Sequence, residues 1–116
     1  ELTSNVNSTL NPIASVSTLR YLNSTKSICD LDLTDWSNAT DTASLGQTST
    51  NTPPYNGYFF YPMSASASAV PNFYVFVEEI ATGDIWAIKY RVIRGIVVTP
   101  SPLRIKGEYD VTVRKL

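Results

Sequence analysis

The chain has 116 residues, the size of a single domain, and 43% of them are hydrophobic, enough for one core. Its formal net charge is -1 and 16% of its residues are charged, so it lacks the basic face that nucleic-acid binding requires. With no histidine and one cysteine, the sequence excludes imidazole catalysis, the usual catalytic triads, a structural zinc site and an intrachain disulfide. No catalytic motif is present, and we expect neither an enzyme nor a bound cofactor.

Residues 1–10 alternate strictly between polar side chains and side chains that are apolar or small. The large apolar positions are Leu2, Val6 and Leu10. Because successive side chains of a strand point to opposite faces, the pattern predicts a two-faced β-strand, which Pro12 ends. We therefore expect residues 1–11 to be an N-terminal extension and candidate donor strand, and residues 12–116 to be the single folded domain. The alternative is that this segment is the first strand of its own domain.

The next segments carry a weak strand pattern at residues 13–22 and a clearer one at residues 28–34. One face of the second segment carries Cys29, Leu31 and Leu33, and the other carries Asp30 and Asp32. Because the cysteine shares its face with two leucines, we expect it to be buried and unreactive.

The only acidic cluster consists of four aspartates: Asp30, Asp32, Asp35 and Asp41. Ca²⁺ takes oxygen ligands of this kind, but the spacing matches no complete calcium-binding loop. The structural alternative is that the first two face solvent on a strand and the others cap loops. We predict no metal site.

The centre of the chain, residues 37–56, contains almost no large apolar side chain. Such a long stretch predicts a functional loop, a glycan-bearing loop or a polar edge strand. Residues 57–61 then form a short aromatic strand that ends at Pro62. The Ser-Ala alternation of residues 64–69 fits either a tight strand pairing or a flexible connector.

The C-terminal half is the clearest part. Residues 73–80 and 84–93 flank a short Gly-containing turn and predict a β-hairpin. The alternation of the second arm breaks at Arg94, before Gly95, which predicts a bulge or a corner there. A Pro-rich turn follows, and residues 103–113 alternate again, as one long strand bent at a glycine or as a tight hairpin.

Seven or eight short strands separated by turn residues favour an all-β fold, an antiparallel β-sandwich of the immunoglobulin-like, pilin-like or jelly-roll kind. A small barrel is the second choice. No apolar run reaches the roughly 20 residues of a membrane-spanning helix, so no membrane span is expected.

The surface is rich in Ser, Thr and Asn and poor in charge, which is typical of secreted rather than cytosolic proteins. Three sequons make their asparagines candidate acceptors of N-linked glycans: Asn7, Asn23 and Asn38. The first residue is glutamate, as in a mature chain whose leader has been removed. We expect an extracellular, cell-surface or virion-surface location.

Aromatic residues concentrate between positions 55 and 76. Half of these rings should face the core, and the rest should form an uncharged, tyrosine-bearing patch. Such patches mark contacts with other proteins, or alternatively sugar-stacking sites. The residues expected at a subunit interface, together with those of the C-terminal strand expected to line an acceptor groove, are Tyr55, Tyr58, Tyr61, Tyr74, Tyr109, Val111 and Val113.

The alternating N-terminal segment, the low-charge Ser/Thr/Asn-rich body and the strand count together resemble donor-strand-exchanging pilins and related extracellular filament subunits. This resemblance implies a homopolymer in which the N-terminal strand of one copy completes the sheet of the next. Cys29 alone cannot form the disulfide of chaperone-assembled pilins, and the apolar N-terminal helix of type IV pilins is missing; archaeal-type glycosylated filaments tolerate both absences.

Two other classes of protein share these features. The first is a virion structural protein, such as a capsid, tail or decoration subunit. The second is a monomeric secreted module with an immunoglobulin-like or carbohydrate-binding role.

Overall fold

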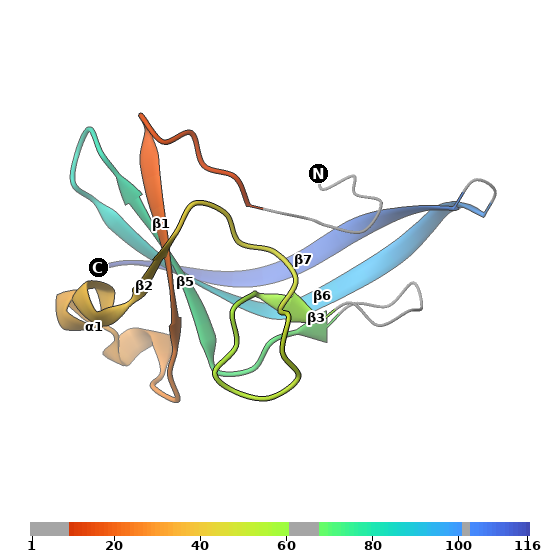
Figure 1. Ribbon diagram of the computed structural model, residues 1–116, viewed down its shortest axis with the longest axis horizontal. Helices are drawn as coiled ribbons and strands as arrows, with labels where there is room; N and C mark the ends of the chain where they lie inside the picture. The colour runs from red at the N-terminus through yellow and green to blue at the C-terminus, as the bar shows by residue number, and fades with distance from the viewer. Residues whose placement is uncertain (1–9, 61–67, 101–102) are drawn as a thin grey trace.

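The computed structural model describes residues 10–60, 68–100 and 103–116 of the chain. Its elements in chain order are β1 (Ser17–Asn23), η1 (Ile28–Asp30), α1 (Leu33–Asn38), β2 (Thr40–Thr42), β3 (Phe59–Phe60), β4 (Ser68–Ala69), β5 (Phe73–Glu79), β6 (Ile85–Pro100) and β7 (Leu103–Lys115). The fold is mostly β, as the sequence predicts, with one short α-helix in addition (Figure 1).

The described residues form two antiparallel sheets, one of five strands in the order β2-β1-β5-β6-β7 and one of two strands, β3-β4. The predicted C-terminal hairpin is confirmed, since β5 and β6 pair antiparallel with Val75 opposite Ile88. Gly83 in the connecting turn has φ 74°, a left-handed conformation that glycine adopts without steric cost.

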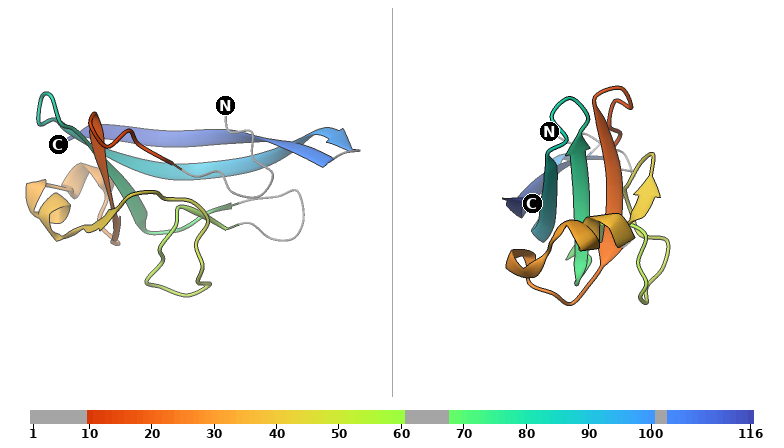
Figure 2. Two further views of the ribbon diagram at one scale, coloured as in Figure 1. Left: turned by 45° about the horizontal axis from the view of Figure 1, so that its top comes forward. Right: turned by 90° about the vertical axis from the view of Figure 1, so that its left-hand side faces the viewer.

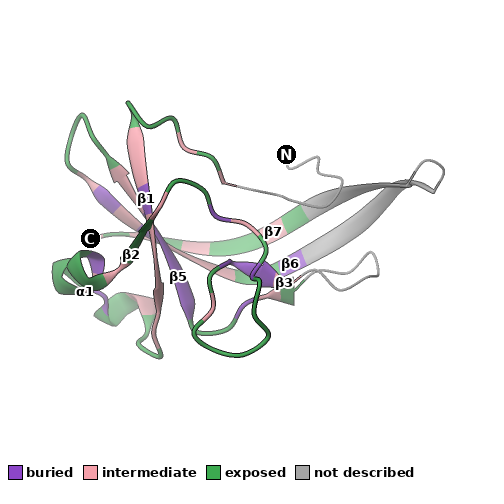
Figure 3. Ribbon diagram, viewed as in Figure 1, coloured by how far each residue is buried: buried purple, intermediate pink, exposed green. Residues whose placement is uncertain are grey.

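The five-stranded sheet is covered on both faces. One face packs against β3 and the loops around it, and this outer core contains Leu19, Leu45, Tyr58, Phe59, Val70, Phe73, Val75 and Ile93. The opposite face packs against η1 and α1, and this helix-side core contains Leu31, Trp36, Tyr74, Phe76, Ile85 and Ala87. Buried residues therefore line both faces of the central strand β5 (Figure 3).

The strand predicted at residues 28–34 is wrong, because side-chain caps turn this segment into two short helices. The Ser27 side chain accepts a hydrogen bond from the Cys29 amide and starts η1. Asp32 and Asp35 form a reciprocal capping box that starts α1. Leu31 is buried between the helices, but Cys29 is exposed, so the predicted burial of the cysteine is also wrong.

The segment predicted as a long polar loop contains local structure. β2 pairs with β1 at the edge of the main sheet, and Gln47 forms a bridge to Phe59. The hydroxyl of the buried Thr48 donates a hydrogen bond to the Asn56 side chain at 3.2 Å, which closes the part of the segment between residues 48 and 56. The expected polar edge strand is therefore present, although it is only three residues long.

The bulge predicted at Gly95 is misplaced. Gly95 pairs in register with Gly107, and the shifts in register lie between Tyr90 and Val92 and between Val97 and Thr99. At the first shift β6 has one residue more than β7, so the side chains after it point to the opposite faces of the sheet. This explains the break in alternation before residue 95. Residues 103–113 belong to one long strand, not to a second hairpin.

β6 and β7 continue together well past the rest of the sheet. Pairing between β5 and β6 reaches only as far as Val75 opposite Ile88, whereas β6 and β7 remain paired to Pro100 opposite Leu103. The hairpin therefore projects along the longest dimension of the molecule, which measures 46 Å (Figures 1 and 2).

Candidate assembly surface

β7 lies at one edge of the five-stranded sheet, and among the described strands it pairs only with β6. The outer side of an edge strand presents backbone donors and acceptors that can pair with another chain. At the opposite edge of the sheet, β2 has only three residues. The long edge of β7 is therefore the candidate site for strand addition.

Two valines make this edge apolar. Val113 is 51% exposed and Val111 is also exposed, although both lie on the sheet face that carries the outer core. The prediction that these valines line the core of their own chain is wrong, because their position at the sheet edge leaves them uncovered. Their exposure leaves them accessible to a partner, and their place in an interface stays a prediction.

The other face of the strand is charged. Asp110 is exposed and pairs with Arg91 of β6 at 2.6 Å. Arg114 is held inward, since its guanidinium donates to the carbonyl oxygens of Ile28 at 2.9 Å and Leu31 at 2.6 Å. The edge therefore offers one apolar and one charged side to an added strand.

A cluster of three tyrosines supports β7 from within its own chain. The ring of Tyr58 stacks on that of Tyr90 with centroids 4.4 Å apart, and Tyr109 of β7 packs against both rings. Burial, with a smaller contribution from Tyr109, raises the pKa of Tyr90 to about 12. Burial also raises the pKa of Tyr58, with the neighbouring phenols adding to the effect.

This cluster predicts a loss of stability at alkaline pH. The pKa of Tyr90 is about 12 in the folded chain against 10.0 ordinarily, so its neutral form stabilises the fold fully below pH 10.0. That contribution is lost progressively as the pH rises through 12. Equilibrium unfolding followed at a series of alkaline pH values is expected to show the decline. Tyr90→Phe should make the decline shallower, with the remaining slope due to Tyr58, and an unchanged pH profile would contradict the assignment.

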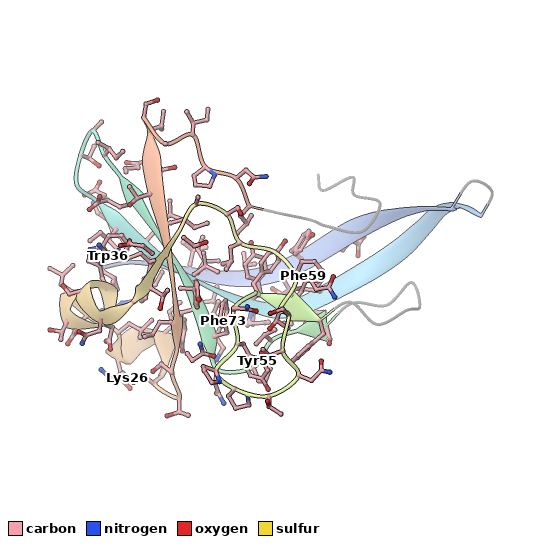
Figure 4. The ribbon with its side chains drawn as sticks, viewed as in Figure 1. Lys26, Trp36, Tyr55, Phe59 and Phe73 are labelled. Atoms are coloured by element: carbon pink, nitrogen blue, oxygen red, sulfur yellow. The ribbon has the colours of Figure 1, made fainter. Side chains whose placement is uncertain are left out.

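Of the other predicted interface tyrosines, the structure places two in the interior. Tyr58 and Tyr74 are fully buried, and the Tyr74 hydroxyl donates to the Lys26 carbonyl, so neither contributes to a surface patch. Tyr55 is half-buried and packs edge-to-face on Phe60 with ring centroids 5.5 Å apart. Figure 4 shows Tyr55, Phe59 and Phe73 gathered near β3, whereas Trp36, a residue of α1, lies toward the left end of the view. Tyr61 lies outside the described residues.

The predicted donor strand is described only at its last residue. Leu10 is half-buried, exchanges two backbone hydrogen bonds with Leu45 (2.7 and 3.1 Å) and packs against the outer core of its own chain. These contacts within its own chain argue against Leu10 as a donor residue, and the domain boundary at residue 11 stays a prediction. Leu2 and Val6 lie outside the described residues.

The sequon asparagines differ in their accessibility. Asn38, the last residue of α1, is exposed. Asn23 is half-buried, and its side chain both donates to the Tyr55 carbonyl and accepts from the Tyr55 amide, each at 2.8 Å. This pair of bonds argues against Asn23 as a glycan acceptor. Asn7 lies outside the described residues.

Three of the four aspartates of the acidic cluster have structural roles. Asp32 and Asp35 cap α1, and hydrogen bonds from the Asp32 amide and Lys26 lower the pKa of Asp35. Asp41 pairs with Arg20 at 2.7 Å. The described residues contain no group of three or more potential metal ligands.

The described helices also include none long and apolar enough to cross a membrane.

A second apolar surface was not anticipated from the sequence. Ile13 is 69% exposed, Val16 57% and Ile80 46%, and we call these three residues the end patch. The Ile80 amide donates to the Val16 carbonyl at 3.0 Å, and the Val16 amide donates to the Ile13 carbonyl at 2.8 Å. For Ile13 and Val16 the available signal was the presence of aliphatic residues in an otherwise polar, uncharged stretch.

Comparison of the chain with protein-family models, with curated proteins and with solved structures finds no match.

Proposed function

We propose that this protein is an extracellular structural subunit that assembles with copies of itself by strand addition. In this proposal the segment before Leu10 of one copy adds to the β7 edge of another. The five-stranded sheet and the small β3-β4 sheet form a reduced β-sandwich that carries this edge. The low charge of the chain and the exposed sequon at Asn38 support a location outside the cell.

The observation that carries the proposal is the apolar edge of β7. An edge strand of 13 residues that carries exposed valines on one face favours pairing with another chain on that face. An added strand would extend the sheet and cover Val111 and Val113. Its backbone would form the ladder of hydrogen bonds by which β-augmentation gains affinity.

The N-terminal segment matches this edge chemically. Its apolar side would bring Leu2 and Val6 beside the exposed valines, and each buried aliphatic side chain contributes about 1.5–3 kcal/mol. Its other side carries uncharged threonine and asparagine, which can form hydrogen bonds with the charged face of β7. Exchange between copies then requires no rearrangement of Leu10, which remains bonded to Leu45 in its own chain.

Peptide complementation tests the proposal. A chain lacking residues 1–9 is expected to remain folded and to lose dilution-resistant assembly in multi-angle light scattering. A fluorescent peptide of residues 1–10 should bind to it, and the peptide with Val6→Asp should not. Val111→Lys combined with Val113→Lys should abolish peptide binding. Electron microscopy of the full-length assembly then distinguishes a filament from a closed virion-like shell.

Leu33→Lys is the matched control, because Leu33 is also an exposed aliphatic residue but lies on α1. It should leave both peptide binding and assembly unchanged. Failure of the peptide to bind the shortened chain, or equal losses with Leu33→Lys, would count against strand addition at β7.

A further inference from the structure

An open cavity of about 700 Å³ lies beside η1 on the helix-side face of the five-stranded sheet. Lys89 of β6 and Thr112 of β7, which are opposite each other in register, belong to its floor. One wall is the loop between β1 and η1, and the other is the segment that leads from β4 into β5. The volume is that of a site for a small molecule.

Hydrogen bonds hold both walls in place. The Ser24 amide donates to the Asn72 carbonyl at 2.9 Å, which ties one wall to the other. The Tyr74 hydroxyl donates to the Lys26 carbonyl, which ties the first wall to β5. Asn72 has φ 53°, a left-handed conformation that asparagine adopts more readily than most residues. The cavity is therefore formed by the chain itself before any ligand binds.

Four polar side chains at the cavity have no hydrogen bond or ion pair with the described residues. Each comes from a different segment, and they are Thr25, Asn72, Lys89 and Thr112. Lys89 is half-buried, and its Nζ lies 5.4 Å from the centroid of the Tyr74 ring. Because a half-buried ammonium group has lost part of its hydration, a carboxylate in the cavity would form a charge-assisted hydrogen bond with it.

The other two cations that line the cavity already have partners. Lys26 pairs with Asp35 at 3.0 Å, and Arg91 pairs with Asp110 at 2.6 Å. Acidic side chains of η1, α1 and β7 surround the region, but none of them lines the cavity: Asp30, Asp35, Glu108 and Asp110. Among the described residues, Lys89 is thus the one lining cation without a carboxylate partner. A single free cation favours a ligand with one negative charge over a phosphate or a polyanion.

The rest of the lining includes an apolar part formed by Ile28, Val70 and Pro71. A sugar ring presents C–H groups that pack on such side chains and hydroxyls that bond to amides and hydroxyls. In this cavity the hydroxyls would meet Asn72 and Thr25, and a carboxylate on the ring would meet Lys89 and Thr112.

We infer that the cavity binds an acidic sugar, a single ring that carries one carboxylate. The inference goes beyond the proposed self-assembly and does not depend on it. The cavity lies on the helix-side face of the sheet, whereas the exposed valines of β7 lie on the face that carries the outer core.

Saturation-transfer difference NMR of the full-length chain with sodium glucuronate tests the site, since the method detects weak ligands of both monomers and large assemblies. Glucuronate should receive saturation from the protein, and added salt should weaken its binding because it screens Lys89. Glucose, which lacks the carboxylate, should bind roughly tenfold more weakly or not at all. Acetate, which lacks the ring, should also bind more weakly than glucuronate.

Lys89→Met keeps most of the length of the side chain and should weaken glucuronate binding roughly tenfold or more. Thr112→Val is a second variant of the floor and should weaken binding to a smaller extent. Lys115→Met is the matched control, because Lys115 also lies over an aromatic ring, 5.9 Å from that of Trp86, but does not line the cavity. Circular dichroism confirms that each variant is folded.

Glucuronate binding that is lost with Lys89→Met and retained with Lys115→Met would support the site. Absence of glucuronate binding to the wild type, or equal binding to the wild type and to both floor variants, would overturn it. Equal binding of acetate and glucuronate would overturn the assignment of a sugar. None of these results changes the expectation for strand addition, which the N-terminal peptide tests separately.

Discussion

Gly57→Ala is expected to prevent the chain from folding stably. A Cβ atom at this buried position would lie 2.3 Å from the Thr48 nitrogen and 2.4 Å from the Gly46 oxygen. These are backbone atoms that cannot rotate away, and they are held by hydrogen bonds from the Tyr58 amide to Gly46 and from the Thr48 amide to Phe59, both of 2.9 Å. Overpacking of this kind costs about 3 kcal/mol or more.

Urea unfolding followed by circular dichroism measures this loss. Gly83→Ala is the matched control, because a Cβ atom there meets no atom within 4 Å and the only cost is the left-handed backbone, with φ 74°. That cost is about 1 kcal/mol. Equal stability of the two variants would contradict the close packing of residue 57 against the loop of Thr48.

The parts of the fold that were predictable from the sequence are those fixed by local signals. The β5–β6 hairpin follows from an aromatic and β-branched run before a glycine-containing turn and from alternating side chains after it. Alternation also predicts a strand at residues 103–113, but it left open whether these residues form one long strand or a tight hairpin.

The helical segment shows where this reasoning stops. Cys29, Leu31 and Leu33 alternate as they would in a strand, yet the hydrogen bonds from backbone amides to Ser27 and Asp32 favour helical turns. Two competing local signals occupy the same seven residues. The outcome depends on the burial of Leu31 and Trp36 against β5, which the sequence alone does not specify.

The candidate site was predictable only in part, for a related reason. The alternation of β7 correctly groups Val111 with Val113, but whether that face is covered depends on the order of the strands. β7 lies at the sheet edge, beyond the reach of the outer core, so its valines are exposed. Strand order and the contacts of Tyr58 are non-local, and they decide which tyrosines lie inside.

Tyr58→Ala is expected to destabilise the fold by about 3–5 kcal/mol, the range found when a large buried aromatic side chain is removed. Tyr58 is 1% exposed and lies between Phe59, whose ring centroid is 4.9 Å away, and Tyr90. Its removal also takes away a ring against which Tyr109 packs, 6.5 Å between centroids. Chemical denaturation measures the loss of stability, and hydrogen exchange should show faster opening of β7.

Two control variants divide the effect of Tyr58→Ala. One distinguishes the loss of the ring from the loss of the hydroxyl, and the other tests whether the effect on β7 is specific to Tyr58. Tyr58→Phe keeps the ring and should cost only about 1 kcal/mol, the worth of one hydrogen bond. Tyr55→Ala removes a half-buried ring that packs on Phe60 and should leave hydrogen exchange in β7 unchanged. Under the proposed strand addition, Tyr58→Ala should weaken binding of the N-terminal peptide, and Tyr55→Ala should not. Unaltered exchange in β7 after Tyr58→Ala would show that the tyrosine cluster does not support this edge.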